Sequence, residues 1–532
     1  MLVIIPIGFL TAAAIAILLL QWLRPGFGLS WVFAGLGALL AWVSMLLLRL
    51  RLPLSLLIDL KLTEFFPYAP ALLLDRISWP YGLGLITLVF AAILTASARK
   101  RFPTDPLNWA GTLAISALGL LAIISGNPLT LLMAWVAVDL VELIILQGNR
   151  PDQNTSQRIV VAYAARTVGA LVFLLAIVLS GIDPNTFSLK HISAQTGLLI
   201  FIGCGLRLGV LPLHLPFSQE PRLRRELGTI LRLVPAISTL MLLARLPAGI
   251  IPEAWAPWLL GLVALAGLYA GGMWLAAKNE MEGRPYWILG WTALAFTCVI
   301  RGLPLSSVAW GIVLLLQGGF LFLYSARERY LLFLPVLGVW GILGLPYSPA
   351  ASGWPGLFEP RLNVFSFAVY LAQWLLLAGF IRHVTRQGYP LASADRWAQA
   401  VYPLGLLFVM ITDLILSLWG WPGSLTRAYA WAGVPALVGC GLFLGLSWRH
   451  ALPELSADQI KSGTPWKVAS RIFNRLSVIF RLEWFYNLMG LVFRSLGRLI
   501  EEVTAILEGD GGVLWTLLLL ALIFSLLGVG GF

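Results

Sequence analysis

The sequence predicts an all-α polytopic membrane protein with about 16 transmembrane helices and one long amphipathic helix along the membrane surface. Of its 532 residues, 59% are hydrophobic and only 11% are charged, whereas soluble proteins carry about 25% charged residues. Apolar runs of about 20 residues recur along nearly the whole chain, and each could cross a bilayer core of about 30 Å as a helix. A soluble multidomain enzyme is therefore excluded.

The predicted spans are separated by charged residues or by breaks rich in proline and glycine. Several begin or end at proline, as at Pro128, Pro304 and Pro346, which suits helix ends near an interface. The spans cover approximately residues 2–22, 27–48, 79–97, 109–126, 128–147, 159–181, 196–214, 229–246, 256–277, 284–301, 304–324, 330–346, 365–383, 400–420, 428–448 and 513–531.

Basic residues are distributed unevenly over the loops between these spans. The odd-numbered loops carry 24 Lys and Arg residues and the even-numbered loops carry 9. Because Lys and Arg accumulate on the cytoplasmic side, we expect the odd loops in the cytoplasm and both termini outside, in a prokaryotic plasma membrane. This topology accounts for the net charge of +12, so nucleic-acid binding is not expected. The N-terminus lacks the features of a signal peptide and is expected to form the first span.

Residues 465–508 differ from the spans because charges recur through them. Lys467, Arg471 and Arg475 are spaced four residues apart and share one helical face. About 44 helical residues would reach roughly 65 Å, which exceeds the bilayer thickness, so this lateral helix is expected to lie along the cytoplasmic surface. It either rests on lipid as an interfacial helix or braces neighbouring subunits.

Ionisable side chains inside the spans are few, and such residues are functional or paired by default. Asp139 and Glu142 lie three residues apart on one face of the fifth span. Two adjacent carboxylates require either a bound proton or a neutralising cation. This pattern favours a proton relay, and the alternative is a static ion pair that holds helices together. The ionisable residues within the spans are Asp139, Glu142, Arg166, Arg207, His214, Arg232 and Asp413.

The seventh span contains a predicted helix break at Pro212, and broken helices at membrane depth usually line a cavity. Arg207 lies beside the break and can anchor the carboxylates of the fifth span. His214 could titrate near neutral pH or cap the broken helix. Arg232 opens the eighth span and could either snorkel to the interface or be buried. Asp413 is central in span 14 and has no obvious partner.

No cofactor or metal and no catalytic centre is expected in this chain. The three cysteines lie singly within apolar runs, and the sequence has only four histidines. Zinc and iron–sulfur sites require clustered Cys or His ligands, and no such cluster is present in the sequence.

Two segments carry a family resemblance. The stretch GLRLGVLPLHLPF, around Arg207, and the stretch LLMAWVAVDLVEL, around Asp139, resemble conserved stretches of the antiporter-like membrane subunits of respiratory complex I, Mrp antiporters and membrane-bound hydrogenases. The resemblance extends over residues 65–420. Fifteen spans followed by a lateral helix and a sixteenth span are similar to the distal antiporter-like subunit of complex I.

The resemblance implies two inverted five-helix repeats, each forming half of a channel. Asp139 then stands where the family has an essential Glu, Arg207 where it has a Lys, and Arg232 near a further Lys. The implied parts are spans 1–3 (1–108), a first repeat (109–246), a second, degenerate repeat (256–383), spans 14 and 15 (400–448), the lateral helix (465–508) and the last span (513–531).

The second repeat departs from the family pattern. Where the family has His and Lys on the eleventh span, this sequence offers only Gln317, and no charge follows the Gly-Leu-Pro turn until Glu359. Arg166, Gln317 and Asp413 are therefore expected to be at most accessory.

Two hypotheses follow. In the first, the chain is a non-redox subunit of a complex I-type assembly, such as an NADH (or ferredoxin):quinone oxidoreductase. It would contribute to proton or cation translocation driven by redox chemistry in partner membrane subunits. In the second, it is a degenerate, non-conducting structural subunit of such a complex. An Mrp-like antiporter and an inorganic-carbon uptake complex are further alternatives.

Overall fold

The computed structural model divides the chain into two compact units, Met1–Phe473 and Asn474–Phe532. Most described residues belong to the first unit. The structure describes residues 1–24, 28–58, 69–98, 106–148, 153–180, 192–215, 223–326, 328–358, 363–386, 388, 391, 395–425, 433–438, 441, 491, 495, 498, 501 and 516–523.

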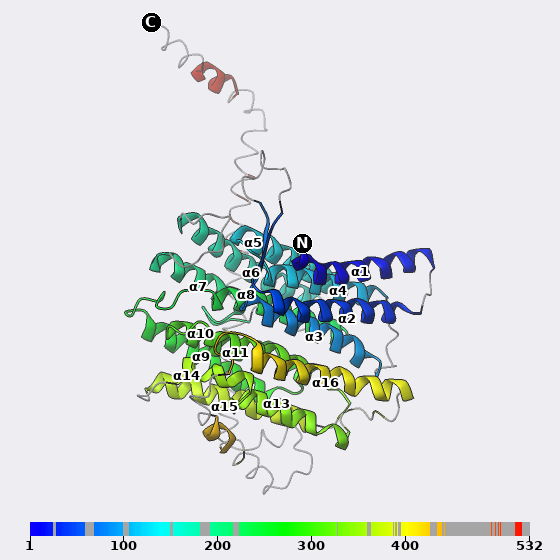
Figure 1. Ribbon diagram of the computed structural model, residues 1–532. Coiled ribbons are helices and arrows are strands. Elements are labelled where there is room, and N and C mark those ends of the chain that lie inside the picture. The colour runs from blue at the N-terminus through cyan, green and yellow to red at the C-terminus, as the bar shows by residue number, and fades with distance from the viewer. Residues whose placement is uncertain are drawn as a thin grey trace. The chain divides into compact units, whose positions relative to one another are not determined.

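The first eight α-helices of the described chain, with one short hairpin, form the N-terminal half of the first unit (Figure 1). Strands β1 (Leu54–Leu57) and β2 (Ala71–Leu74) pair antiparallel, with Leu54 opposite Leu74. The helices are α1 (Ile5–Leu23), α2 (Ser30–Leu48), α3 (Ser78–Ala96), α4 (Pro106–Ile123), α5 (Pro128–Gly148), α6 (Gln153–Ser180), α7 (Ala194–Leu208) and α8 (Arg225–Ala244), with short turns η1 (Leu2–Ile4) and η2 (Arg49–Arg51).

The C-terminal half of the unit is also helical. The eleventh predicted span of the chain is one continuous helical segment, in which a π-helical turn, η4 (Val313–Gln317), joins two α-helices, α11 (Ser306–Ile312) and α12 (Gly318–Leu323). The helices are α9 (Ala256–Ala276), α10 (Glu280–Ile300), α11 (Ser306–Ile312), α12 (Gly318–Leu323), α13 (Phe333–Leu343), α14 (Trp354–Leu357), α15 (Val364–Val384) and α16 (Arg396–Trp419), with short turns η5 (Arg329–Leu331) and η6 (Pro349–Ser352).

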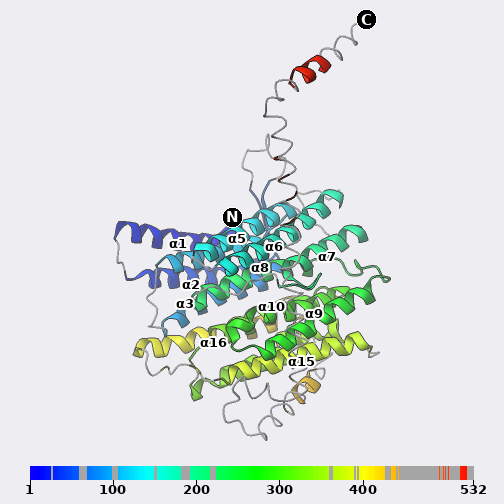
Figure 2. The same ribbon diagram turned by 180° about the vertical axis from the view of Figure 1, so that it is seen from behind.

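The two halves lie side by side, with α1 to α8 on one side and α9 to α16 on the other (Figures 1 and 2). Helix α8 contacts α10 and α11 across the boundary, and α16 packs against α3. The helices at this boundary are the most buried in the unit: no residue of α8 or of the segment from α11 to α12 is exposed. Polar residues on them are therefore shielded from both lipid and water.

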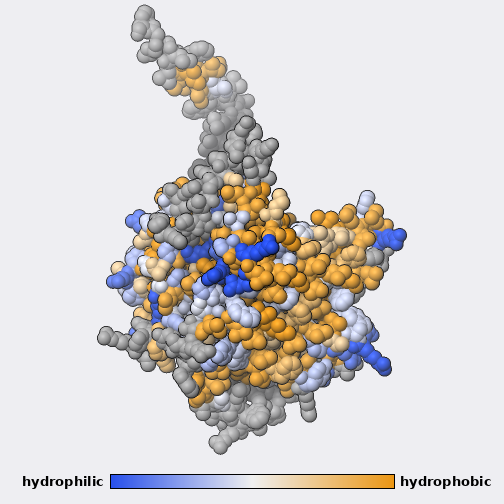
Figure 3. All heavy atoms as spheres, in the orientation of Figure 1, coloured by the Kyte–Doolittle hydropathy of each residue, from blue (hydrophilic) through white to orange (hydrophobic). Residues whose placement is uncertain are grey.

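The outer helices present aliphatic side chains to their surroundings, as Figure 3 shows on one face of the molecule. On α5, the exposed residues Met133, Val136, Leu140 and Ile144 follow helical spacing along one side. Eleven helices in the described residues are long and apolar enough to cross a membrane, and α7 and α13 are shorter apolar helices. The protein is an integral membrane protein.

Each of the first fourteen predicted spans falls on a helical segment, which confirms the all-α membrane class. The number of sixteen is not reached within the described residues. The hairpin of β1 and β2 was not expected from the sequence and lies in the loop between the second and third spans. The predicted lateral helix (465–508) and most of spans 15 and 16 lie outside the described residues.

Candidate functional site

Helix α5 carries the two carboxylates toward the interior. Its first turn is capped by Asn127, whose Oδ1 accepts from Thr130 N at 2.8 Å, and Pro128 occupies the first helical position, where no N–H is needed. The exposed aliphatic side of α5 faces outward, so the opposite side is buried. Asp139 and Glu142 both lie on that buried side and are 2% and 0% exposed.

Asp139 is paired with Arg207 of α7. Arg207 Nη1 donates to Asp139 Oδ2 at 2.8 Å and to the backbone carbonyl of Arg166 at 3.2 Å. The guanidinium also lies over the ring of Trp135, with 4.2 Å between Cζ and the ring centroid. Arg207 was expected to anchor both carboxylates of the fifth span; in the structure it pairs with Asp139, among the described contacts, and makes a cation–π contact with Trp135.

Arg166 of α6 bridges the two carboxylates. Its Nη1 lies 2.5 Å from Glu142 Oε2 and its Nε lies 3.5 Å from Asp139 Oδ1. Arg166 was expected to be accessory, yet it is the only residue that contacts both acids among the described pairs. It is the only charged residue in the predicted sixth span, which indicates that it needs a partner but not which acid it contacts.

Arg232 of α8 completes the group. Its Nη1 donates to Glu142 Oε1 at 2.7 Å, and the side chain is buried. Snorkelling to the interface, one of the two alternatives for this residue, is therefore wrong.

Pro235 interrupts the backbone ladder of α8 one turn later, and its carbonyl accepts from the hydroxyls of Ser238 and Thr239. Thr239 Oγ1 also accepts from Arg207 Nε at 3.4 Å.

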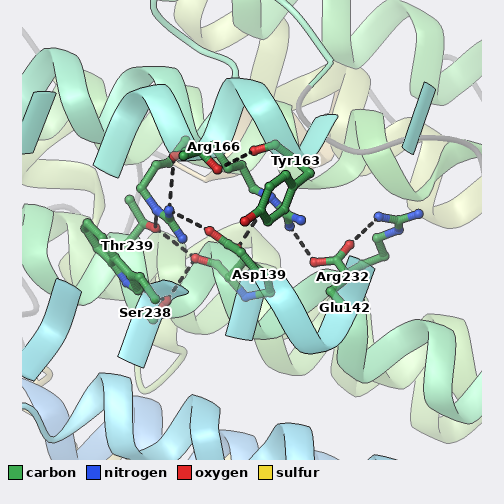
Figure 4. Close-up of polar contacts among 11 residues, drawn as sticks. Asp139, Glu142, Tyr163, Arg166, Arg232, Ser238 and Thr239 are labelled. Atoms are coloured by element: carbon green, nitrogen blue, oxygen red, sulfur yellow. Dashed lines mark hydrogen bonds and ion pairs between the residues drawn. The ribbon is translucent and has the colours of Figure 1, made fainter. Parts of the chain in front are cut away.

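The five side chains form one continuous chain of alternating charge, running Arg207–Asp139–Arg166–Glu142–Arg232 across four helices. Figure 4 shows its central part, with Asp139, Arg166, Glu142 and Arg232 labelled. We call these five residues the ion-pair chain. Each carboxylate has two arginine partners, so neither acid faces the other without a cation between them. Because arginine does not give up its proton in proteins, only the two carboxylates can change protonation state.

The break after α7 positions Arg207 in the last turn of that helix. The helix ends at Leu208 because Gly209 adopts a left-handed conformation with φ of 75°, so regular structure stops before Pro212 is reached. His214 Nδ1 lies 2.8 Å from the carbonyl oxygen of Pro212, and the ring is buried. No described ion pair joins His214 to the ion-pair chain.

Helices α6 and α7 approach closely through Gly169 and Gly203. A Cβ atom at Gly169 would lie 2.6 Å from Arg207 Cγ and 2.8 Å from the carbonyl oxygen of Gly203. Small residues at such crossings let membrane helices pack backbone to backbone. This contact sets the distance between the helices that carry Arg166 and Arg207, and therefore the geometry at Asp139.

Replacing Gly169 by alanine is expected to lower the free energy of unfolding by about 1–3 kcal/mol, because the methyl group forces α6 and α7 apart. Gly148→Ala is the matched control, since nothing lies within 4 Å of a Cβ there. Denaturant titration of the detergent-solubilised protein measures both. Equal stability of the two variants would show that the crossing tolerates a wider spacing.

Other charged groups lie at the ends of the helices. Arg225 Nη2 pairs with Glu280 Oε1 at 2.8 Å and joins α8 to α10, and Arg245 Nη2 lies 3.2 Å from Asp75 Oδ2. Neither ion pair was predicted from the sequence. Gln317 and Asp413 lie in the other half of the unit, share no described contact with the ion-pair chain, and approach one another.

The fold is shared with chains of solved membrane complexes. A chain of the membrane-bound sulfane sulfur reductase, an archaeal respiratory membrane complex, matches with a TM-score of 0.68 and 14% identity over 99% of this chain and 100% of that one. A chain of the Mrp complex from Dietzia sp. DQ12-45-1b matches with a TM-score of 0.66 and 12% identity over 94% and 63%. No protein-family model and no curated protein matches the sequence.

A chain of respiratory complex I from Thermus thermophilus matches with a TM-score of 0.61 and 20% identity, over 83% of this chain and 99% of that one. These matches confirm, at the level of the fold, the resemblance to the antiporter-like membrane subunits. Each matched chain belongs to a membrane complex.

Proposed function

We propose that this chain is an antiporter-like membrane subunit of a multi-subunit, complex I-type assembly and that it contributes to proton translocation. The observation that carries the proposal is the ion-pair chain, whose five buried side chains connect four helices without interruption. The fold shared with chains of respiratory and Mrp complexes supports it. Partner chains would carry the electron transfer, from NADH or ferredoxin as the donor to quinone as the acceptor.

The arrangement allows a switch between two pairings. Arg166 lies 2.5 Å from Glu142 and 3.5 Å from Asp139, so it holds one acid closely and the other loosely. A proton on Asp139 would weaken the ion pairs of Asp139 with Arg207 and Arg166, so that Arg166 would pair with Glu142 alone. A proton on Glu142 would weaken the ion pairs of Glu142 with Arg166 and Arg232, so that Arg166 would pair with Asp139. Such a two-state element can couple proton uptake on one side to release on the other.

The test is proton pumping by the complex purified through this subunit and reconstituted in liposomes with its electron donor. Asp139→Asn is expected to lower pumping by at least about tenfold, because the amide cannot carry the proton. Asp139→Glu should restore part of the rate. Glu253→Gln, which changes an exposed carboxylate in a loop, serves as the control. Arg207→Ala provides a second disruption of the same pair.

A second candidate is a structural subunit that does not conduct. The observation in its favour is the absence of lysine from the ion-pair chain: all three cations are arginines, which stay charged. Wild-type pumping by both Asp139→Asn and Arg207→Ala, with the complex intact, would establish this candidate and refute translocation through the chain.

The placement in the cell also belongs to the proposal. We infer a prokaryotic plasma membrane with both termini outside, because basic residues concentrate in the odd loops. The lateral helix predicted over 465–508 would then lie on the cytoplasmic side against partner subunits. An Mrp-like or inorganic-carbon uptake assembly would use the same fold with different partners.

A further inference from the structure

A second buried polar group lies in the other half of the unit. Asp413 lies in the C-terminal third of α16 and is 1% exposed, and Gln317, the last residue of the π-helical turn η4, is fully buried. Single π turns occur frequently at functional sites. Neither residue takes part in the ion-pair chain, and the mechanism proposed above does not use them.

Two glycines of α13 make room for these side chains. A Cβ atom at Gly341 would lie 2.6 Å from Gln317 Nε2 and 2.9 Å from Asp413 Oδ2. A Cβ atom at Gly338, one helical turn earlier, would lie 3.0 Å from Gln317 Oε1. The amide of Gln317, from η4, and the carboxyl group of Asp413, from α16, therefore both reach the face of α13 at Gly341.

The surroundings of Asp413 contain no cation among the described elements packed against α16. Helices α12 and α13 and the turns η4 and η6 contribute no charged or titratable residue, and α3 contributes only Tyr81, whose hydroxyl lies at Gly311. On α16 itself, Arg396 and Tyr402 precede Asp413 by more than two turns. Arg49 donates to the carbonyl of Trp419, six residues beyond Asp413 at the C-terminal end of α16, and its side chain is not among the described partners of Asp413.

The hydrogen-bonding groups of the two residues have no other partner in the part of the chain that the structure describes. Both oxygens of Asp413 and both amide atoms of Gln317 are buried without a hydrogen bond of good geometry. An ionised carboxylate in such a place is far more costly than a neutral carboxyl group. Glutamine matches a neutral carboxyl group well, because its oxygen accepts the O–H and its NH₂ donates to the carbonyl.

We propose that Asp413 and Gln317 form a proton-binding site, separate from the ion-pair chain, in which Asp413 carries an exchangeable proton. The proton comes from water and returns to water, and Gln317 is its hydrogen-bond partner in the bound state. The two sites differ in kind: Asp139 and Glu142 are each paired with two arginines, whereas Asp413 lies in apolar surroundings beside an uncharged glutamine. This inference does not depend on whether the ion-pair chain conducts.

The test uses dicyclohexylcarbodiimide, an apolar reagent that modifies protonated carboxyl groups within membranes. After labelling of the full-length protein, mass spectrometry of its peptides measures the modified fraction of each acid. We expect Asp413 to be labelled at least tenfold more than Asp139 or Glu142 at the same pH. Its labelling should fall as the pH is raised, and Gly341→Ala, which fills the site, should reduce it. Gly148→Ala is the matched control.

A second measurement tests whether the site accepts a neutral side chain of the same shape, which keeps the proposal testable apart from the labelling reagent. Asp413→Asn keeps the shape of the neutral form and should unfold at the wild-type denaturant concentration. The proposal is overturned if Asp413 is labelled no more than the arginine-paired acids, or if its labelling is independent of pH. It is also overturned if Na⁺ at constant pH suppresses the labelling, because the site would then bind a metal cation.

Discussion

Glu142→Gln is expected to lower the free energy of unfolding by about 3–5 kcal/mol, the cost of leaving buried charge without its partner. Glu142 is fully buried and pairs with Arg166 at 2.5 Å and with Arg232 at 2.7 Å. The ion-pair chain has three arginines and two carboxylates, a net charge of +1. Loss of the Glu142 charge raises this to +2 and removes the ion pairs of Glu142 with Arg166 and Arg232.

The matched variant is Arg232→Met, which removes a charge of the opposite sign from the same pair. The remaining four residues are then neutral overall, and Glu142 keeps Arg166 as its partner. We therefore expect a clearly smaller loss of stability than for Glu142→Gln. The double variant should be more stable than Glu142→Gln alone, because its net charge returns to +1. Equal losses for the two single variants would contradict this account of the charge balance.

Trp310→Ala is expected to cost about 3–5 kcal/mol of unfolding free energy, as large-to-small changes of buried aromatic residues do. Trp310 is fully buried in α11. Its ring stacks on Trp291 with centroids 5.6 Å apart, meets Trp354 edge-on at 5.8 Å, and donates from Nε1 to the carbonyl of Gly353 at 3.2 Å. Removal leaves a cavity and takes one of its hydrogen-bond donors from the carbonyl of Gly353, which still accepts from Gly356 N at 3.1 Å.

Trp258 is the control, because this tryptophan of α9 is 75% exposed on the outer surface. Trp258→Ala should change stability by about 0.5 kcal/mol or less, and Trp310→Phe, which keeps a ring, should lie between the two. Thermal unfolding in detergent, followed by circular dichroism, compares all three. A cost for Trp258→Ala as large as that for Trp310→Ala would mean that the buried aromatic cluster adds no particular stability.

Hydropathy predicted the helices well because a bilayer imposes one length on every span. The fourteen spans before residue 420 all coincide with helical segments. The hairpin of β1 and β2 was missed because short strands in a loop leave no comparable signal. The π turn at η4 was missed because it keeps the apolar pattern of the surrounding helix and changes only the hydrogen bonding.

The members of the ion-pair chain could be found from the sequence, but their pairing could not. Arg166, Arg207 and Arg232 lie inside predicted spans, and a charge in hydrocarbon must find a partner. Which arginine bridges the two acids depends on the rotation of α6 and on its close approach to α7 at Gly169. Those are tertiary features, without a signature in local sequence.

Gln317 and Asp413 show the same limit. Each was recognisable as a polar residue in an apolar run, but they come from helices far apart in the sequence. Their meeting is determined by α13, where glycines at 338 and 341 replace side chains that would otherwise separate them. A glycine in an apolar helix has many uses, so its presence alone does not indicate such a meeting.

Helix α5 separates the ion-pair chain from the outer surface of the protein by the width of one helix, about 10–12 Å. One side presents Met133, Val136, Leu140 and Ile144 outward, and the other carries Asp139 and Glu142. Dissolved salt screens charges only where its ions can approach, and neither hydrocarbon nor packed protein admits them here. Salt in the surrounding solution therefore screens the electric field of the ion-pair chain only weakly. The field acts on the neighbouring helices with little dependence on ionic strength.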